Sequence, residues 1–378
     1  MHISRLQIRH FRNLKNIDIS ASEACNVFCG KNAQGKTNLL ESISLLSGNR
    51  SRRSAHYSEL VQFGECNASV NAEVITSFFS FDSKVTLGPN GLRYLLSDKR
   101  VSAAKMGDDG IKAIMFTPDD LQIPKGSPSD RRRLIDQSMA VLYPEYKKIL
   151  VEYDRVLKQR NTLLKRRRDM GPSGDQVGST EALLTALDQQ LASRAARIII
   201  YRRRFIEHFH VLFAESYKQI ATISETTTLT YQCKHVAEDL LDEAEIMSSV
   251  LLQLAERIPL DTIRATTSIG PHRDDFCFEI SGRDAKKFAS QGQIRCIMLA
   301  YKIAQINDMF ERHGEYPVLL LDDMSSELDQ TRNDFLHRYI SEVSCQVFLT
   351  TTRPDILPES MRGLTFNIED GAIKAMAV

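Results

Sequence analysis

Apolar and polar residues alternate in short stretches along the first third of the chain. Ile3, Leu6 and Ile8 fall in the first predicted strand. The following strands are predicted at residues 17–19, 26–29, 70–81, 84–87, 92–97 and 112–116, with a turn at residues 89–91. Apolar residues at helical spacing predict a helix from Gly35 to about Ser47.

The middle of the chain changes to helical periodicity. Residues 129–169 predict a helical stretch with a break at Pro144, and residues 180–220 predict a second long helix. A turn rich in Gly, Ser and Pro, residues 171–179, separates them, so the two helices should form an antiparallel hairpin. A shorter helix is expected near residues 237–257.

Predicted strands and helices alternate in the last third. The strands are expected at residues 275–280, 317–321, 346–350, 364–368 and 372–376, and the helices at residues 293–312 and 330–343. This alternation is typical of a parallel sheet covered by helices. The sequence therefore predicts an α/β fold with an inserted helical arm.

Composition adds few constraints to this picture. The contents of hydrophobic residues (42%) and charged residues (26%) are ordinary for a soluble globular protein. No apolar run approaches the roughly 18 residues that a membrane helix needs, and residues 1–11 lack the apolar block of a signal peptide. The seven cysteines lack the spacing of a zinc site and are expected to be reduced. We expect a cytoplasmic protein with no membrane partner.

Charge is distributed unevenly, although the net charge is only +1. Residues 130–220 hold 18 Lys and Arg against 11 Asp and Glu, whereas the rest of the chain holds 31 against 37. A basic middle predicts one surface for a polyanion. The clusters that could neutralise phosphates are Arg131, Arg132 and Arg133; Lys165, Arg166, Arg167 and Arg168; and Arg202, Arg203 and Arg204. The alternative for each cluster is a solvated helical face.

The segment after the third strand matches the phosphate-binding pattern GxxxxGK[ST]. Its residues are Gly30, Lys31, Asn32, Ala33, Gln34, Gly35, Lys36 and Thr37. The glycines let the backbone curl until several N–H groups point at a phosphate chain, and the following helix adds its positive end. In such a loop Lys36 reaches the β- and γ-phosphates of ATP, and the Thr37 hydroxyl ligates magnesium (Mg2+).

An apolar strand near the end of the chain is followed by two acids, Asp322 and Asp323. Acids at the carboxyl end of a buried parallel strand lie where α/β sheets bind ligands. We expect Asp322 to hold Mg2+, as a Walker B acid does, and Asp323 to orient or deprotonate the attacking water. The alternative is a pair that caps the next helix. Because nearly three hundred residues separate the loop from these acids, the chain resembles the heads of the SMC and Rad50 group of ABC ATPases.

Residues 288–293, Phe-Ala-Ser-Gln-Gly-Gln, are similar to the ABC signature LSGGQ, with Gln291 in the place of a glycine. In that class the signature contacts the γ-phosphate bound by the opposite subunit. Ser290, Gly292 and Gln293 at a helix N-terminus suit an anion. The resemblance therefore implies a head-to-tail dimer around two ATP molecules. The alternative is a plain serine N-cap.

Other segments resemble conserved motifs of the ABC class, but two of them lack the residue that is usual there. Residues 325–329, Ser-Ser-Glu-Leu-Asp, resemble the D-loop. Thr351 or Thr352 takes the place of the switch histidine that many ABC proteins carry after the next strand. No glutamine stands where the Q-loop is expected, and Asp119 or Asp120 lies in that region instead.

Three further segments make the chain similar to the RecF family. Arg12 and Asn13 follow the first strand, where the RecF and SMC-type N-terminus carries an arginine that reaches the nucleotide. Residues 129–136 resemble the RecF segment RRxxxD at the base of a helical arm, and residues 270–275 resemble the segment GPHRDD. With the signature and the acids, these segments span nearly the whole chain in family order.

The resemblance implies a P-loop ABC-type ATPase head, formed by residues 1–125 and 263–378, with an α-helical arm at residues 126–262. RecF proteins dimerise on ATP and bind double-stranded DNA or its junction with single strands. They act with RecR and RecO to place RecA on gapped DNA. We therefore expect a slow ATPase of DNA repair. The alternatives are another SMC/Rad50-like repair ATPase and a DNA-binding scaffold with vestigial ATPase sites.

Overall fold

The computed structural model describes residues 1–49, 51, 56–89, 91–170, 177–221, 225–354, 357 and 363–377. Backbone contacts divide the chain into two units. Unit 1 comprises Met1–Gln122, Glu215–Ser224 and Ser290–Val378, and unit 2 comprises Ile123–Ala214 and Glu225–Ala289. No helix of the described residues is long and apolar enough to cross a membrane.

The division between the units differs from the boundaries drawn from the sequence. The first boundary falls after Gln122 rather than after residue 125, and the last falls before Ser290 rather than before residue 263. The second difference arises because β10 (Asp275–Ile280) pairs with β9 (Thr227–Gln232) and so stays with unit 2.

Unit 1 contains an antiparallel sheet in the order β2-β1-β4-β5-β6-β7. Its strands are β1 (His2–Phe11), β2 (Leu14–Ser20), β4 (Ala68–Ile75), β5 (Ser80–Gly88), β6 (Gly91–Leu96) and β7 (Lys99–Val101). The single strand predicted at residues 70–81 is wrong. Thr76 closes a turn there, because its N–H and its hydroxyl both donate to the carbonyl of Phe79. Of the turn predicted at residues 89–91, Asn90 lies outside the described residues.

The second sheet of unit 1 has the order β15-β14-β3-β13-β12-β8. Its strands are β3 (Cys25–Cys29), β8 (Ala113–Phe116), β12 (Val318–Asp322), β13 (Val347–Thr351), β14 (Leu364–Glu369) and β15 (Ala372–Ala377). All neighbours are parallel except β14 and β15, which form an antiparallel hairpin. The predicted parallel sheet is therefore confirmed, and β12, whose first four residues are apolar, lies inside it.

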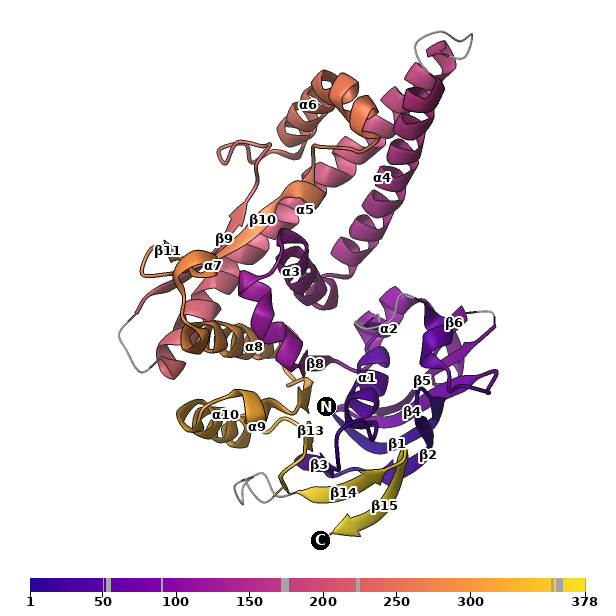
Figure 1. The fold of residues 1–378 in the computed structure, drawn as a ribbon, viewed down its shortest axis with the longest axis vertical. Helices are drawn as coiled ribbons and strands as arrows, with labels where there is room; N and C mark the ends of the chain where they lie inside the picture. The colour runs from indigo at the N-terminus through magenta and orange to yellow at the C-terminus, as the bar shows by residue number, and fades with distance from the viewer. Residues whose placement is uncertain are drawn as a thin grey trace. The chain divides into compact units, whose positions relative to one another are not determined.

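Helices cover both faces of this parallel sheet. They are α1 (Lys36–Leu45), α8 (Gln291–His313), α9 (Met324–Glu327) and α10 (Gln330–Glu342); α2 (Ala103–Asp109) lies beside β6. Helix α1 packs on β8, β12 and β13, and in Figure 1 α8 and α10 lie on the other side of these strands. The strands that carry the loop and the acids are thus enclosed on both faces.

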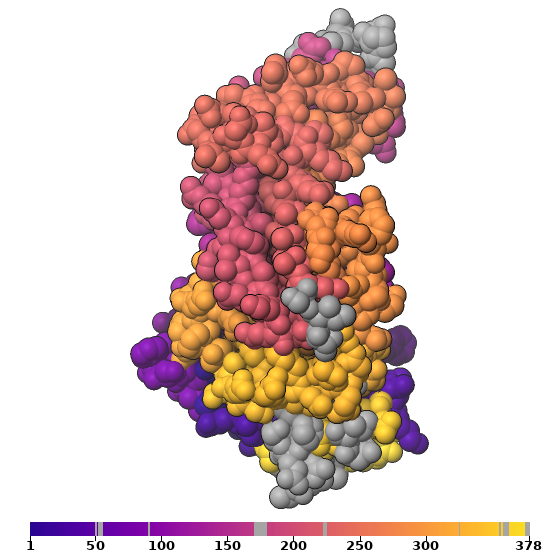
Figure 2. Space-filling model, turned by 90° about the vertical axis from the view of Figure 1, so that its left-hand side faces the viewer, coloured from indigo at the N-terminus to yellow at the C-terminus, as the bar shows by residue number. Residues whose placement is uncertain are grey.

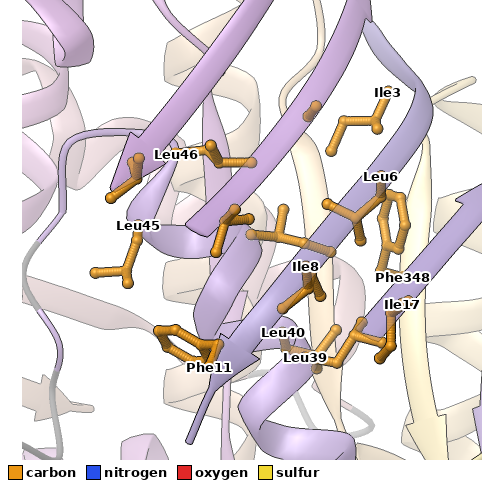
Figure 3. Close-up of a cluster of buried hydrophobic side chains, with 14 of the residues drawn as sticks. Ile3, Leu6, Ile8, Phe11, Ile17, Leu39, Leu40, Leu45, Leu46 and Phe348 are labelled. Carbon is orange, nitrogen blue, oxygen red and sulfur yellow. The ribbon is translucent and has the colours of Figure 1, made fainter. Parts of the chain in front are cut away.

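The main hydrophobic core of unit 1 lies between the two sheets, with α1 inside it. Figure 3 shows Leu6 and Ile8 of β1 beside Leu39 and Leu40 of α1, with Phe348 of β13 close by. All five side chains are buried. Because α1 is packed from two sides, the loop before it has a fixed anchor.

Unit 2 is mostly helical. Its elements are α3 (Pro128–Leu142), α4 (Pro144–Met170), most of α5 (Val177–Ile220), β9, α6 (Glu243–Arg264), β10, β11 (Arg283–Asp284) and α7 (Ala285–Phe288). Figure 2 shows the orange segment that ends unit 2 beside the rose segment of α5. The predicted long helices are confirmed, but the helix expected near residues 237–257 runs from Glu243, which Asp242 caps, and β9 was not predicted. Of the predicted turn, residues 171–176 lie outside the described residues.

Candidate functional site

The loop between β3 and α1 has the strained backbone that its glycines allow. Gly30 and Gly35 have φ angles of 154° and 109°, and Ala33 lies at 65°. A Cβ atom on Gly30 would come within 2.4 Å of the carbonyl oxygen of Ile368. Any larger residue at position 30 would therefore clash with β14. A glycine is needed there because there is no room for a side chain, as well as because of its φ angle.

Lys36 closes over this loop from the first turn of α1. Its Nζ donates hydrogen bonds of 2.6 and 2.9 Å to the carbonyl oxygens of Gly30 and Lys31. Burial lowers the pKa of Lys36, while the charges of Asp323 and Asp322 oppose this shift. The ammonium group is thus held at the mouth of the loop, where an anion would meet it.

Thr37, Asp322 and Thr350 meet behind the loop. The hydroxyls of Thr37 and Thr350 both donate to Oδ1 of Asp322, at 2.9 and 2.8 Å. The parallel register of β12 and β13 places Asp322 beside Thr350. The two residues predicted to hold magnesium, 285 positions apart, are thus in direct contact.

Asp323 lies directly after β12 in the left-handed region, with φ of 48°. Its N–H donates to the carbonyl and to the hydroxyl of Thr350, at 3.2 and 3.1 Å, and the Ser326 hydroxyl donates to its carbonyl oxygen. Asp323 is the N-cap residue of α9, but its side chain caps no backbone N–H. Burial raises the pKa of its carboxyl, with smaller contributions from the charges of Asp322 and Glu327.

The residues after β1 occupy the side of the loop. Asn13 accepts a 2.8 Å hydrogen bond from the amide of Asn38 and lies 3.5 Å from the carbonyl of Ala33. Arg12 instead forms a two-pronged ion pair with Glu41 of α1, at 2.5 and 3.0 Å. The predicted contact of Arg12 with the nucleotide therefore has a competing partner in Glu41.

The C-terminal hairpin also reaches the loop, which the sequence did not predict. Gln34 accepts a 2.6 Å hydrogen bond from the N–H of Asp370, at the turn between β14 and β15. A Cβ atom on the neighbouring Gly371 would come within 1.9 Å of the carbonyl oxygen of Asn13. Side-chain patterns carry no signal for such backbone contacts.

The signature-like turn starts α8. The Ser290 hydroxyl accepts from the N–H of Gln293, and the Gln293 side chain accepts from the N–H of Ser290, so the turn is a capping box. The N-cap alternative is therefore correct as local structure. Ser290 and Gln291 are exposed, which leaves the N-terminus of this long helix open to an anion.

The D-loop segment lies next to this turn through Arg332, a residue that sequence reasoning missed. A Cβ atom on Gly292 would lie 3.4 Å from Nη2 of Arg332. Arg332 also forms an ion pair with Asp329, the N-cap of α10, and its Nε lies 3.0 Å from Sγ of Cys296. The signature-like turn and the D-loop segment are thus neighbours in unit 1.

Residues near the two acids make further contacts. Thr350 contacts Asp322, whereas the Thr351 hydroxyl accepts from the N–H of Arg353. Asp120, in the region where the Q-loop is expected, is buried and pairs with Lys302 at 3.2 Å. The register of β13 against β12, which a single sequence does not give, decides which threonine lies beside Asp322.

Comparison with known proteins identifies the family. The model of the RecF/RecN/SMC N terminal domain matches residues 2–373. The DNA replication and repair protein RecF of Streptococcus pyogenes serotype M49 (strain NZ131) is 36% identical over 377 residues, covering 99% of this chain and 98% of that protein. The RecF of serotype M12 (strain MGAS9429) matches equally. The chain belongs to the RecF family.

Solved structures agree with this assignment. A structure of the recombination mediator protein RecF-ATPrS in the RecFOR pathway has a TM-score of 0.89 and 31% identity, covering 99% of this chain and 97% of that one. The corresponding RecF-ATP structure has a TM-score of 0.87 and the same identity and coverage. The Smc head domain of Pyrococcus furiosus, at 18% identity and a TM-score of 0.53, shares the fold alone. The predicted ABC-type head fold is confirmed.

Two segments that carry the RecF-family resemblance bind each other inside unit 2. Arg131 donates hydrogen bonds of 2.9 and 2.7 Å to the two carboxylate oxygens of Asp275. Arg132 donates to the carbonyl of Asp274 at 2.6 Å. Burial lowers the pKa of the neighbouring His272 to about 4, so its ring is neutral at pH 7. These segments hold α3 against β10.

Several arginines predicted to bind DNA in this RecF-family chain are engaged internally. Arg131 is buried, and so is Arg202, which pairs with Asp136 and donates to the carbonyl of Pro271. Arg203 donates to the carbonyls of Leu240 and Ala237. The prediction that Arg131 and Arg202 offer a DNA surface is wrong, because they neutralise carboxylates within the unit.

The remaining predicted arginines are accessible to different degrees. Arg167 pairs with Glu181 at 3.3 Å, and Arg168 pairs with Asp169 at 2.9 Å. Arg133 and Arg166 are exposed. The sequence alone did not distinguish the buried or paired arginines from the exposed ones, because a run of arginines does not show which of its side chains face the protein interior.

The ion pair of Arg12 with Glu41 yields a stability prediction. Arg12→Gln should lower the free energy of unfolding of unit 1 by about 3 kcal/mol, because it leaves a buried carboxylate without its cation. Urea denaturation would measure this change. The double variant Arg12→Gln/Glu41→Gln should be more stable than Arg12→Gln alone. Unchanged stability together with weaker ATP binding would assign Arg12 to the nucleotide instead.

Proposed function

We propose that this chain is an ATP-dependent DNA-binding protein of recombinational repair, which binds ATP at residues 30–37 and dimerises around it. The observation that carries the proposal is the 2.9 Å contact between Thr37 and Asp322, next to a lysine that already reaches across the loop. N–H donors, a cation and oxygen ligands are what a nucleoside triphosphate with Mg2+ requires.

The Thr37 hydroxyl and the Asp322 carboxylate fit Mg2+, because this ion takes oxygen ligands. When bound, Mg2+ would neutralise charge that develops on the β- and γ-phosphate oxygens. Thr350 would keep its 2.8 Å hydrogen bond to Asp322 and fix the orientation of the carboxylate.

Two further side chains would act on the triphosphate. Lys36 would exchange the carbonyls of Gly30 and Lys31 for β- and γ-phosphate oxygens. Asp323 would orient the attacking water and accept its proton. Burial raises the pKa of Asp323 and so makes it a stronger base than an exposed aspartate. Its side chain is shorter than that of a glutamate, so we expect slow hydrolysis.

The dimer is supported by the arrangement of unit 1. Helices α1 and α8 lie on either side of β8 in Figure 1, so the exposed turn at Ser290 starts a helix other than the one that holds the loop. A second copy placed head to tail would bring this turn to the γ-phosphate of the first. Two ATP molecules would then be enclosed by two chains.

Double-stranded DNA and its junction with single strands are the proposed polyanions. The support is the excess of basic residues at positions 130–220 and the names of the relatives, which are DNA replication and repair proteins. The RecFOR pathway named for the solved relatives makes RecR and RecO the proposed partners. RecA is the proposed recombinase that is loaded on gapped DNA.

Lys36→Met tests the proposal as a whole. It should weaken ATP binding by about 100-fold, because two charge-assisted hydrogen bonds are lost, and it should abolish the ATP dependence of DNA binding. Titration calorimetry and DNA anisotropy would measure the two effects, with the exposed Lys15→Met as the control. DNA binding that is equal with and without ATP in the wild type would favour the scaffold with vestigial sites.

Asp323→Asn should separate binding from turnover. The variant should bind ATP and accumulate as a dimer, and its kcat should fall by about 100-fold or more, because the proton acceptor is lost. Phosphate release and light scattering would measure these effects, with Asp334→Asn on α10 as the control. Turnover at the wild-type rate would exclude Asp323 as the base.

Ser290→Arg should prevent ATP-driven dimerisation and leave ATP binding by the monomer unchanged. A bulky cation at this turn would fill the space of the partner's γ-phosphate, whereas the loop of the same chain would stay intact. Light scattering with ATP should therefore report monomers whose ATP affinity is unchanged. Ser248→Arg on α6 adds the same charge elsewhere and should still dimerise. A Ser290→Arg dimer of normal affinity would contradict the signature assignment.

A further inference from the structure

One face of α4 carries five exposed cations: Lys148, Arg155, Lys158, Lys165 and Arg166. We call this set the α4 basic stripe. At 3.6 residues per turn, the five positions fall within an arc of about 100°. The predicted cluster at residues 165–168 overlaps only the end of this stripe, so the stripe is a feature of helical geometry and not of a run in the sequence.

Within the part of the chain that the structure describes, the α4 basic stripe has no charge partners. Among the described residues, none of its five side chains makes a hydrogen bond or an ion pair. Two acids of the same helix are engaged by other arginines, Glu152 by Arg194 and Asp169 by Arg168. Asp154, which lies at the edge of the stripe, also has an interaction. The positive charge of the stripe is therefore available to an anionic ligand.

The opposite face of α4 fixes the helix. Arg160 is fully buried and pairs with Asp188 of α5 and Asp261 of α6, at 2.5 and 2.8 Å. Tyr153, also buried, has its hydroxyl 2.6 Å from Nδ1 of His272. Because this face is held by three other segments of unit 2, the stripe is presented on a rigid rod.

The dimensions of the stripe favour a straight polyanion. Lys148 and Arg166 are 18 positions apart, which corresponds to about 27 Å at 1.5 Å per residue. Duplex DNA carries one charge per roughly 1.7 Å and stays straight over a persistence length of about 50 nm. A straight row of cations can therefore follow a duplex backbone for most of one helical turn.

Other polyanions fit this face less well. A site for single strands needs aromatic side chains on which bases stack, and the aromatic residues Tyr146 and Tyr153 of α4 are buried. Binding to a lipid surface needs an exposed apolar face, and Val151 is the one large apolar residue exposed on α4 among those the structure describes.

We propose that the α4 basic stripe is the surface of unit 2 that binds the backbone of duplex DNA. This inference rests on the DNA binding proposed above and assigns it to one face of one helix. Phosphate contacts of this kind carry no sequence information, so binding along the stripe is independent of sequence and strongly dependent on salt.

The test is a triple variant of the full chain, Arg155→Gln/Lys158→Gln/Lys165→Gln, assayed with ATP and a duplex of about 30 base pairs. Each lost phosphate contact should reduce the slope of log K against log salt by about 0.9, so the slope should fall by about 2.7. Fluorescence anisotropy across a sodium chloride series measures it. The matched control, Arg257→Gln/Arg264→Gln/Arg283→Gln, removes three exposed charges from α6 and β11 and should keep the wild-type slope.

The outcomes separate this inference from the proposed function. A wild type that binds no duplex overturns both. Duplex binding by the wild type, with the same slope in the stripe triple variant, overturns the stripe alone. An equal loss in the control triple variant overturns it too, because the effect would then be one of net charge. A loss that is as large for a single-stranded oligonucleotide, or for vesicles of phosphatidylserine, assigns the stripe to another polyanion.

Discussion

The architecture of unit 1 depends on the hydrogen bonds that Asp322 accepts from Thr37 and Thr350. A buried carboxylate is costly unless donors surround it, and these two hydroxyls supply them. The contact ties the first helix of the chain to a strand near its end. It also fixes the distance between the loop and the acids, which is the property that a phosphate site with a metal requires.

The loop and the acids could be predicted because each is identified by a short, continuous stretch of sequence. A glycine pattern before Lys36, combined with two acids after an apolar strand, is typical of a nucleotide site. Thr350 could not be chosen among three consecutive threonines, because the choice depends on how β13 is aligned with β12. Likewise, the ion pair of Arg12 with Glu41 joins two elements whose contact the sequence does not encode locally.

The helical arm shows the opposite case. Its long helices were predictable from their periodicity, but the roles of its arginines were not. Arg131, Arg160 and Arg202 are buried and hold the arm together through carboxylates from other elements. Reading basic clusters from the sequence therefore assigned Arg131 and Arg202 to a DNA surface although they are buried. It left out Lys148 and Arg155, which lie outside the three predicted clusters.

The contact of Gly30 with Ile368, together with that of Gln34 with Asp370, has a consequence for biosynthesis. The loop emerges from the ribosome early, but the turn that contacts it is made 336 positions later. A nascent chain stalled before β14 would carry the complete glycine pattern without the backbone that packs against it. Nucleotide affinity should therefore be acquired only after translation has passed Asp370, which would keep incomplete ATPase heads from engaging partners.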